Sequence, residues 1–272
     1  MNELALFAGA GGGLLGGILC GFRTVCAVEI NSYCREILLR RQMDNILHKF
    51  PIWDDVRTFE GHPWRGKINI ITGGFPCQDI SAAGSGKGLR GKKSSLWFEM
   101  CRIVCEIRPQ YMFAENSPLL AHRGLHTVLS NLAEAGYNVE WDVFSAQETG
   151  APHRRERMFI LATDSNSTRQ QSNVSCRIES QISLPSSKSY MADSNSAWEL
   201  QSERTLEKQW GWSPYSSKQI RSKNWSVEPN VDRVVNGMAH RVDRLTALGN
   251  GQVPIVAANA FIELFNRLHK RY

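Results

Sequence analysis

The sequence has no apolar stretch near the roughly 18 residues that a membrane-spanning helix needs, and no basic segment ahead of a long apolar run at its start. It also has no C-x-x-C pair and no Cys/His spacing suited to zinc, and its seven cysteines are scattered. These absences predict a cytoplasmic protein in a reducing compartment, with no metal and no membrane association.

Charge of neither sign dominates the chain. Its 32 lysines and arginines outnumber its 26 acidic residues to give a net charge of +6. An excess of this size suits a polyanionic partner and equally suits an ordinary basic protein, so charge alone selects no function. The 272 residues are enough for one substantial core with a small second lobe.

What the sequence does contain is an alternation of short apolar runs with helical patterns. The apolar runs predict strands near residues 3–8, 24–29, 68–71, 110–116, 138–146 and 158–162. Helical patterns predict helices near residues 32–47, 96–107, 122–135 and 254–268. This alternation is typical of an α/β fold with a doubly wound, Rossmann-like sheet.

A glycine-rich loop and acidic residues follow the first strands. The string F-A-G-A-G-G at residues 7–12 opens a helix, as in folds that bind a ligand at a helix N-terminus, although a turn without a ligand has the same composition. Glu29 ends the next strand, where an acid reaches ribose hydroxyls in doubly wound sheets. Asp54 and Asp55 follow a further short apolar stretch.

The string G-G-F-P-C-Q at residues 73–78 is the strongest candidate for a reactive site. Two glycines after an apolar strand should turn the backbone sharply out of the sheet, and Pro76 fixes φ just before Cys77. An aimed thiol suits attack on an electrophilic ring carbon. Glu115 also ends a strand, and in a parallel sheet it would lie at the same edge as Cys77.

Residues 79–95 form a glycine-rich stretch with four cations, Lys87, Arg90, Lys92 and Lys93, against a single acid, Asp79. Directly after a nucleophile, such a stretch predicts a cationic lid over phosphates, although a solvated surface loop has the same composition.

The composition changes at residue 163, where serine and glutamine become dense and the apolar period fades until about residue 236. We therefore expect two units: a catalytic domain formed by residues 1–163 with 237–272, and a small inserted lobe at residues 164–236.

The motifs together are more specific than any one of them. F-A-G-A-G-G at 7–12, G-G-F-P-C-Q at 73–78, E-N at 115–116, R-E-R at 155–157 and G-N at 249–250 resemble, in order, motifs of the cytosine-C5 DNA methyltransferases of the phage or bacterial restriction-modification type. Three places depart from the family's pattern: Ser117 stands after E-N where valine is usual, His153 stands where glutamine is usual, and Gly251 and Gln252 replace the usual residues after G-N.

The resemblance implies roles for residues at matching positions. The implied catalytic residues are Cys77, Glu115, Arg155 and Arg157, with Arg155 on the oxygen of the base. The implied contacts to S-adenosylmethionine are Phe7, Gly9, Gly11, Glu29, Asp55, Pro76, Leu96 and Asn250, with Asp54 a close rival to Asp55. The implied DNA contacts are Gln78, Ser81, Lys87, Arg90, Lys92 and Lys93.

The implied reaction is methylation at C5 of a cytosine flipped out of double-stranded DNA, with Cys77 bonded to C6 during the reaction. The implied recognition lobe is residues 164–236. The expected assembly is a monomer with double-stranded DNA, beside a cognate restriction endonuclease that acts separately. The same chemistry on RNA, a catalytically silent DNA-binding relative, and a nicotinamide dehydrogenase remain alternatives.

Overall fold

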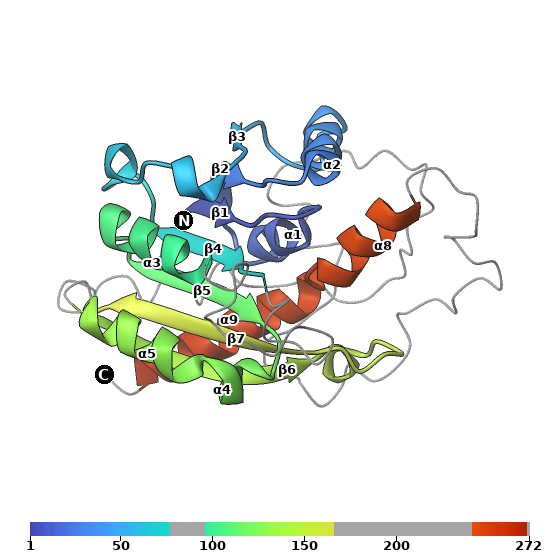
Figure 1. Cartoon of the computed structure of the whole chain (residues 1–272). Coiled ribbons are helices and arrows are strands. Elements are labelled where there is room, and N and C mark those ends of the chain that lie inside the picture. Colours follow the sequence, from blue (N-terminus) through green and yellow to red (C-terminus); the bar gives the residue numbers. More distant parts are fainter. Residues whose placement is uncertain (77–95, 166–240, 271–272) are drawn as a thin grey trace.

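The computed structural model describes residues 1–76, 96–165 and 241–270. In these residues a seven-stranded sheet has the order β3-β2-β1-β4-β5-β7-β6 (Figure 1). Strands β1 to β5 pair in parallel, whereas β7 lies antiparallel to both of its neighbours. The strands are β1 (Asn2–Leu6), β2 (Arg23–Val28), β3 (Ile52–Trp53), β4 (Ile70–Gly74), β5 (Tyr111–Asn116), β6 (Tyr137–Ser145) and β7 (Glu156–Asp164).

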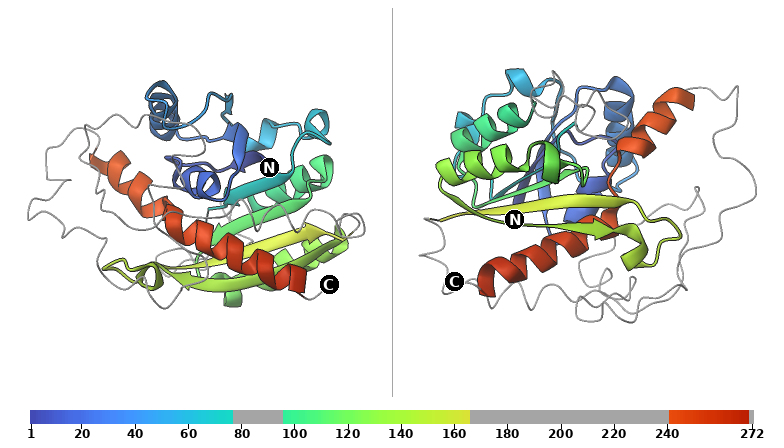
Figure 2. Two further views of the ribbon diagram at one scale, coloured as in Figure 1. Left: turned by 180° about the vertical axis from the view of Figure 1, so that it is seen from behind. Right: turned by 60° about the horizontal axis from the view of Figure 1, so that its bottom comes forward.

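Helices cover both faces of the sheet, as the alternating pattern predicts (Figures 1 and 2). Helices α3 and α5 pack on one face, and α1, α2 and α9 pack on the other. The α-helices are α1 (Gly12–Leu19), α2 (Ser32–Met43), α3 (Leu96–Ile107), α4 (Leu120–Arg123), α5 (Leu125–Glu134), α8 (Arg241–Asn250) and α9 (Pro254–Lys270). The described part of the chain also contains three short 3-10 helices, η1 (Val56–Thr58), η2 (His62–Trp64) and η4 (Ala146–Thr149).

Side chains of the central strands are buried on both faces of the sheet. The sequences of these strands are therefore almost continuously apolar. On β1, Leu4 and Leu6 join the core under α3, and Ala5 joins the core under α1 and α2. On β5, Met112 and Phe113 divide in the same way between the two faces. The predicted doubly wound α/β sheet is confirmed, while the predicted recognition lobe, apart from residues 164 and 165, lies outside the described residues.

Helix α9 returns along the sheet and brings its N-terminal end against α1 (Figure 2). A side chain at Gly16 would place its Cβ 2.8 Å from the carbonyl oxygen of Pro254, and one at Gly12 would overlap the carbonyl oxygen of Gln252. The glycines of α1 therefore allow two backbones to touch, which sets residues 250–254 beside the glycine-rich loop.

Two local expectations were wrong. Gly73 and Gly74 do not turn the chain out of the sheet but remain in β4, because Gly73 pairs with Ala114 and Gly74 pairs with Glu115. The helix expected at 122–135 begins earlier, at Leu120, and is divided into α4 and α5 at Gly124, whose extended φ of 163° is not helical.

Among the described residues, no helix is long and apolar enough to cross a membrane.

Candidate active site at the carboxyl edge of the sheet

The ends of β4 and β5 lie side by side, as expected for parallel strands. Gly74 is in register with Glu115, and Asn116 Nδ2 donates a hydrogen bond of 3.0 Å to the carbonyl of Phe75. Phe75 is buried against Trp97 of α3, with ring centroids 5.4 Å apart. The segment that leads into Cys77 is thus held on two sides, although Cys77 itself lies outside the described residues.

Glu115 is a buried carboxyl at this edge. Only 9% of the residue is exposed, and Arg157 Nε lies 2.9 Å from its Oε1. Burial raises the pKa of Glu115 to about 7, against the opposing effects of Arg157, of Arg155 and of a hydrogen bond from Gln252. The group can therefore give or take a proton near neutral pH.

The antiparallel direction of β7 brings the two arginines to Glu115. Met158 pairs with Asn116, so the residues just before it lie at the carboxyl end of β5. A parallel β7 would have placed its beginning at the opposite edge of the sheet. The sequence motif therefore meets Glu115 only because β7 runs against the other strands.

The two arginines have different partners. Arg157 contacts Glu115, whereas Arg155 Nη2 donates to the carbonyls of Gly249, at 2.9 Å, and of Gly251. Arg155 also has a positive φ of 31°, which is uncommon for a residue with a side chain. Its guanidinium joins the start of β7 to the last turn of α8 and to the first residue of the connection between α8 and α9.

The glycine-rich loop lies next to Glu29 at the end of β2. Phe7, Gly9 and Gly11 all have positive φ, of 53°, 54° and 90°. Glu29 is 8% exposed and accepts two backbone hydrogen bonds of 2.7 Å, from the N–H of Gly9 and from that of Asn31. The carboxylate therefore fixes the loop, and its remaining lone pairs can accept from a ligand.

The two acids after β3 differ in what holds them. Both carboxylate oxygens of Asp55 accept from Arg57, at 2.9 Å and 2.6 Å, and Asp55 also caps η1 by accepting from the Arg57 N–H. These hydrogen bonds from Arg57 lower the pKa of Asp55. Asp54 is exposed and accepts from the N–H of Asp55.

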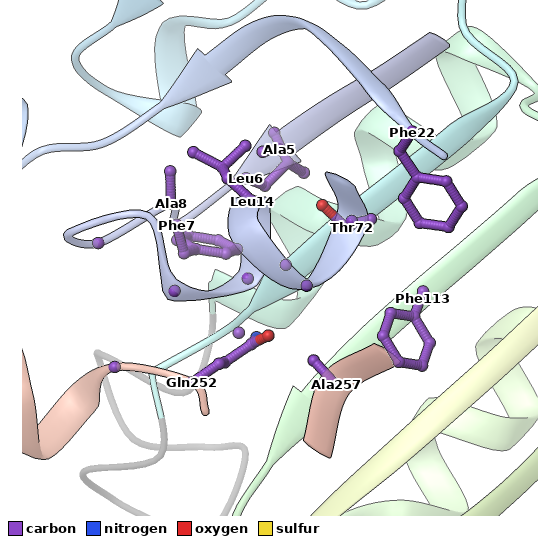
Figure 3. Close-up of a pocket in the computed structure, with 18 of the residues that line it drawn as sticks. Ala5, Leu6, Phe7, Ala8, Leu14, Phe22, Thr72, Phe113, Gln252 and Ala257 are labelled. Atoms are coloured by element: carbon purple, nitrogen blue, oxygen red, sulfur yellow. The ribbon is translucent and has the colours of Figure 1, made fainter. Parts of the chain in front are cut away.

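A cavity runs from the glycine-rich loop to the underside of α1 (Figure 3). It is lined by Phe7 and Gly9, by the end of β4, and by residues 250–252, which include Asn250 at the end of α8. Neither Glu29 nor Asp55 lines this cavity. Leu96, at the start of α3, packs against the apolar core, and Pro76 ends the described stretch after β4.

The other residues predicted for the site lie outside the described ranges. They are Cys77, Gln78, Ser81, Lys87, Arg90, Lys92 and Lys93. Within the described ranges, no group of three or more His, Cys, Asp or Glu side chains could hold a metal ion.

The sequence reasoning missed two contributors. Gln252 departs from the family's pattern, yet its amide lies beside the Glu115 carboxyl at Gly74 and lowers the pKa of that carboxyl. Glu3, which is fully buried in β1, accepts hydrogen bonds of 2.6 Å from Thr24 of β2 and Thr72 of β4. Glu3 had no visible signal beyond a charge inside an apolar strand, and it ties together the strands that carry the two halves of the site.

The sheet order and the acids at its carboxyl edge define a methyltransferase-type α/β fold. The chain matches the family of C-5 cytosine-specific DNA methylases over residues 1–249, and it belongs to that family.

Individual relatives match the chain over shorter stretches. The Type II methyltransferase M.PspPI of Psychrobacter sp. (strain TA137) is 36% identical over 162 residues, which cover 57% of this chain and 38% of that protein. M.CviJI, from Paramecium bursaria Chlorella virus IL3A, is 37% identical over 163 residues, which cover 59% and 42%. The chain thus spans less than half the length of these relatives.

Solved structures give the same fold. An Escherichia coli prophage protein described as a DNA modification methyltransferase is 26% identical, with a TM-score of 0.50 over 62% of this chain and 48% of its own. The Entamoeba histolytica methyltransferase EhMeth is 15% identical, with a TM-score of 0.61 over 98% of both chains. At that identity, the second likeness concerns the fold alone.

Proposed function

We propose that this protein transfers a methyl group from S-adenosylmethionine to C5 of a cytosine in double-stranded DNA. The observation that carries the proposal is Glu115, a buried carboxyl with a pKa near 7, in register with the strand that leads to Cys77. A carboxyl that is partly protonated near neutral pH can donate to N3 of a cytosine ring.

Several features near the loop fit S-adenosylmethionine. A Cβ at Gly9 would meet no atom within 4 Å, so a ligand can approach the loop closely. Phe7 and Asn250 line the cavity from facing segments, and Glu29 keeps acceptor capacity beside the loop. We propose that these residues hold the methionine and ribose parts, with Asp54 or Asp55 nearest the adenine. When bound, S-adenosylmethionine supplies a methyl group on a positively charged sulfur.

The chain's own residues would act on the base. Cys77 adds its thiolate to C6, which turns C5 into a carbon nucleophile. Glu115 donates its proton to N3 as negative charge develops in the ring. After C5 has gained the methyl group, a water molecule takes the C5 proton, the C5–C6 double bond re-forms, and Cys77 leaves C6 as a thiolate. N3 then returns its proton to Glu115.

We assign the contact with the base oxygen to Arg157 in preference to Arg155. Arg157 lies against Glu115, whereas Nη2 of Arg155 already donates to two backbone carbonyls. A guanidinium that touches both the carboxyl and the base would keep them in one plane.

DNA would be held by residues after Cys77. Gln78 and Ser81 are proposed to contact the strand near the flipped base, and Lys87, Arg90, Lys92 and Lys93 to contact phosphates, which carry no sequence information. Removing a base from the stack costs a few kcal/mol, which these contacts would offset.

The test is methylation of plasmid DNA in an expressing host that lacks cytosine methylation, mapped by bisulfite sequencing. Wild type should leave 5-methylcytosine at one recurring sequence, and Cys77→Ser should leave none while it still binds donor and DNA. Purified wild type should also form a covalent adduct with DNA that contains 5-fluorocytosine. Methylation of transfer RNA in place of DNA, or no adduct, would refute the proposal.

We further propose that sequence recognition resides in residues 164–236. This segment has no motif of the family and differs in composition from the rest of the chain. If this segment is replaced by that of a relative whose DNA recognition sequence is known, the chimera should methylate the relative's sequence. An active chimera that kept the parental site would refute this assignment.

A further inference from the structure

We propose that Gln252 is a positioning residue that holds the carboxyl of Glu115 and connects it to the first turn of α1, beside the glycine-rich loop. This inference rests on the role proposed above for Glu115. It concerns the position at which the chain departs from its family's usual pattern after G-N.

Gly74 is the point where the two side chains meet. A Cβ at position 74 would lie 2.8 Å from Oε2 of Glu115 and 3.1 Å from Nε2 of Gln252. The carboxyl and the amide therefore share the space that any larger residue at position 74 would occupy. The Gln252 amide in this place lowers the pKa of Glu115, against the effect of burial. The second glycine of the G-G-F-P-C string thus makes room for this contact.

The other end of the amide faces α1 (Figure 3). A Cβ at Gly13 would lie 2.9 Å from Oε1 of Gln252, and the backbone carbonyl of Gln252 closes over Gly12. The N-terminus of α1 has no side-chain cap, so its partial positive charge favours an oxygen there. The amide is therefore oriented with its oxygen toward α1 and its nitrogen toward Glu115.

Glu115 is consequently held from two directions. Arg157 of β7 lies against Oε1, and Gln252, from the connection between α8 and α9, reaches the side of Oε2. The charged groups that face this carboxyl are Arg157 and Arg155. Arg155 also binds the carbonyls on both sides of Asn250, so the segment that carries Gln252 is itself anchored.

The expected consequence concerns both proton affinity and position. Replacement of Gln252 by methionine, which has similar length and no amide, removes a group that favours the charged carboxylate and should therefore raise the pKa of Glu115.

The experiment is a titration of selectively ¹³C-labelled glutamate carboxyls by NMR, with the Glu115 signal assigned through Glu115→Gln. Gln252→Met should move the Glu115 midpoint upward, and Gln252→Asn, which keeps the amide but shortens its reach, should move it in the same direction. Gln147→Met alters an exposed glutamine on η4 and should leave the midpoint in place. An unchanged midpoint in both folded Gln252 variants would overturn the proposal.

A second measurement connects the titration with catalysis. The alkaline limb of the pH profile for methyl transfer should shift upward in Gln252→Met by the same amount as the NMR midpoint. If wild type transfers no methyl group to DNA, the proposed function fails, while the titration still decides whether Gln252 positions Glu115. If Gln252→Met shifts the NMR midpoint of Glu115 but leaves the pH profile of methyl transfer unchanged in an active enzyme, Gln252 has no role in the reaction.

Discussion

The two halves of the sheet's carboxyl edge hold their acidic groups by different means. Glu29, beside β1, is held by backbone N–H groups of the neighbouring loop and of the residue that caps α2. Glu115, at the end of β5, is held by side chains from β7 and from the segment before α9. The first arrangement joins residues that are 2 and 20 positions apart in the chain, whereas the second forms only after more distant elements have docked.

This difference also separates two kinds of chemistry. Backbone donors fix the shape of a loop, which suits recognition of a ligand that keeps one charge state. Side-chain donors around a buried carboxyl change its proton affinity, which suits a group that must exchange a proton. Substitutions on the two sides should therefore have separable effects.

The largest effect is expected from Glu115→Gln, which keeps the shape but removes the exchangeable proton. We expect kcat for methyl transfer to fall by about 10²- to 10⁴-fold, because this is the usual contribution of general acid–base catalysis. Donor affinity, measured by calorimetry, should stay the same. If donor affinity fell by the same factor as kcat, Glu115 would belong to the donor-binding half of the sheet's edge and would not act on the base.

The same carboxyl should produce a pH dependence of stability. Its pKa is near 7 in the folded protein and near 4.5 when exposed, so the folded state binds the proton more tightly. Its contribution to stability is thus fully present below about pH 4.5 and is lost as pH rises through 7, by about 3 kcal/mol in all. Urea unfolding across this pH range should show that the free energy of unfolding falls by this amount in wild type and not in Glu115→Gln. The same pH dependence of the unfolding free energy in both proteins would contradict the prediction.

A smaller effect, confined to the donor side, is expected from Glu29→Ala. Loss of an ionised acceptor should weaken S-adenosylmethionine binding by about 1.5–3 kcal/mol, or roughly ten- to hundredfold. Calorimetry should detect this loss, and methylation at saturating donor should recover. Glu36→Ala removes an exposed acid on α2 and serves as the control, with no change expected. Equal affinity in both variants would remove Glu29 from the donor site.

The smallest effect is expected from Asp55→Asn. Its side chain is 24% exposed and is already bound to the exposed Arg57, and ion pairs near the surface contribute little. Donor affinity should change by less than about fivefold. The matching Asp54→Asn variant decides which acid lies nearer the donor, since only the acid in contact should alter affinity. A loss with Asp55→Asn as large as that with Glu29→Ala would show that Asp55 gives up Arg57 when the donor binds.

Much of the fold could be predicted because the relevant signals are local. The apolar runs and helical periods locate β2, α3, β5 and α9 closely, and the acids at the strand ends follow from those positions. The role of Gly74 was misjudged for a physical reason: glycine permits a turn, but it equally permits two side chains to meet over a flat strand.

By itself, the sequence determined the order of the elements and the residue types that end them, because period and motif are properties of neighbouring residues. It also contained the motifs that mark the family. Only the tertiary structure decided that β7 runs antiparallel, that Arg157 lies against Glu115 while Arg155 binds two carbonyls, and that Gln252 reaches the same carboxyl. These contacts join residues far apart in the chain, and their geometry arises when β7 pairs with β5 and α9 packs against α1, which no local pattern encodes.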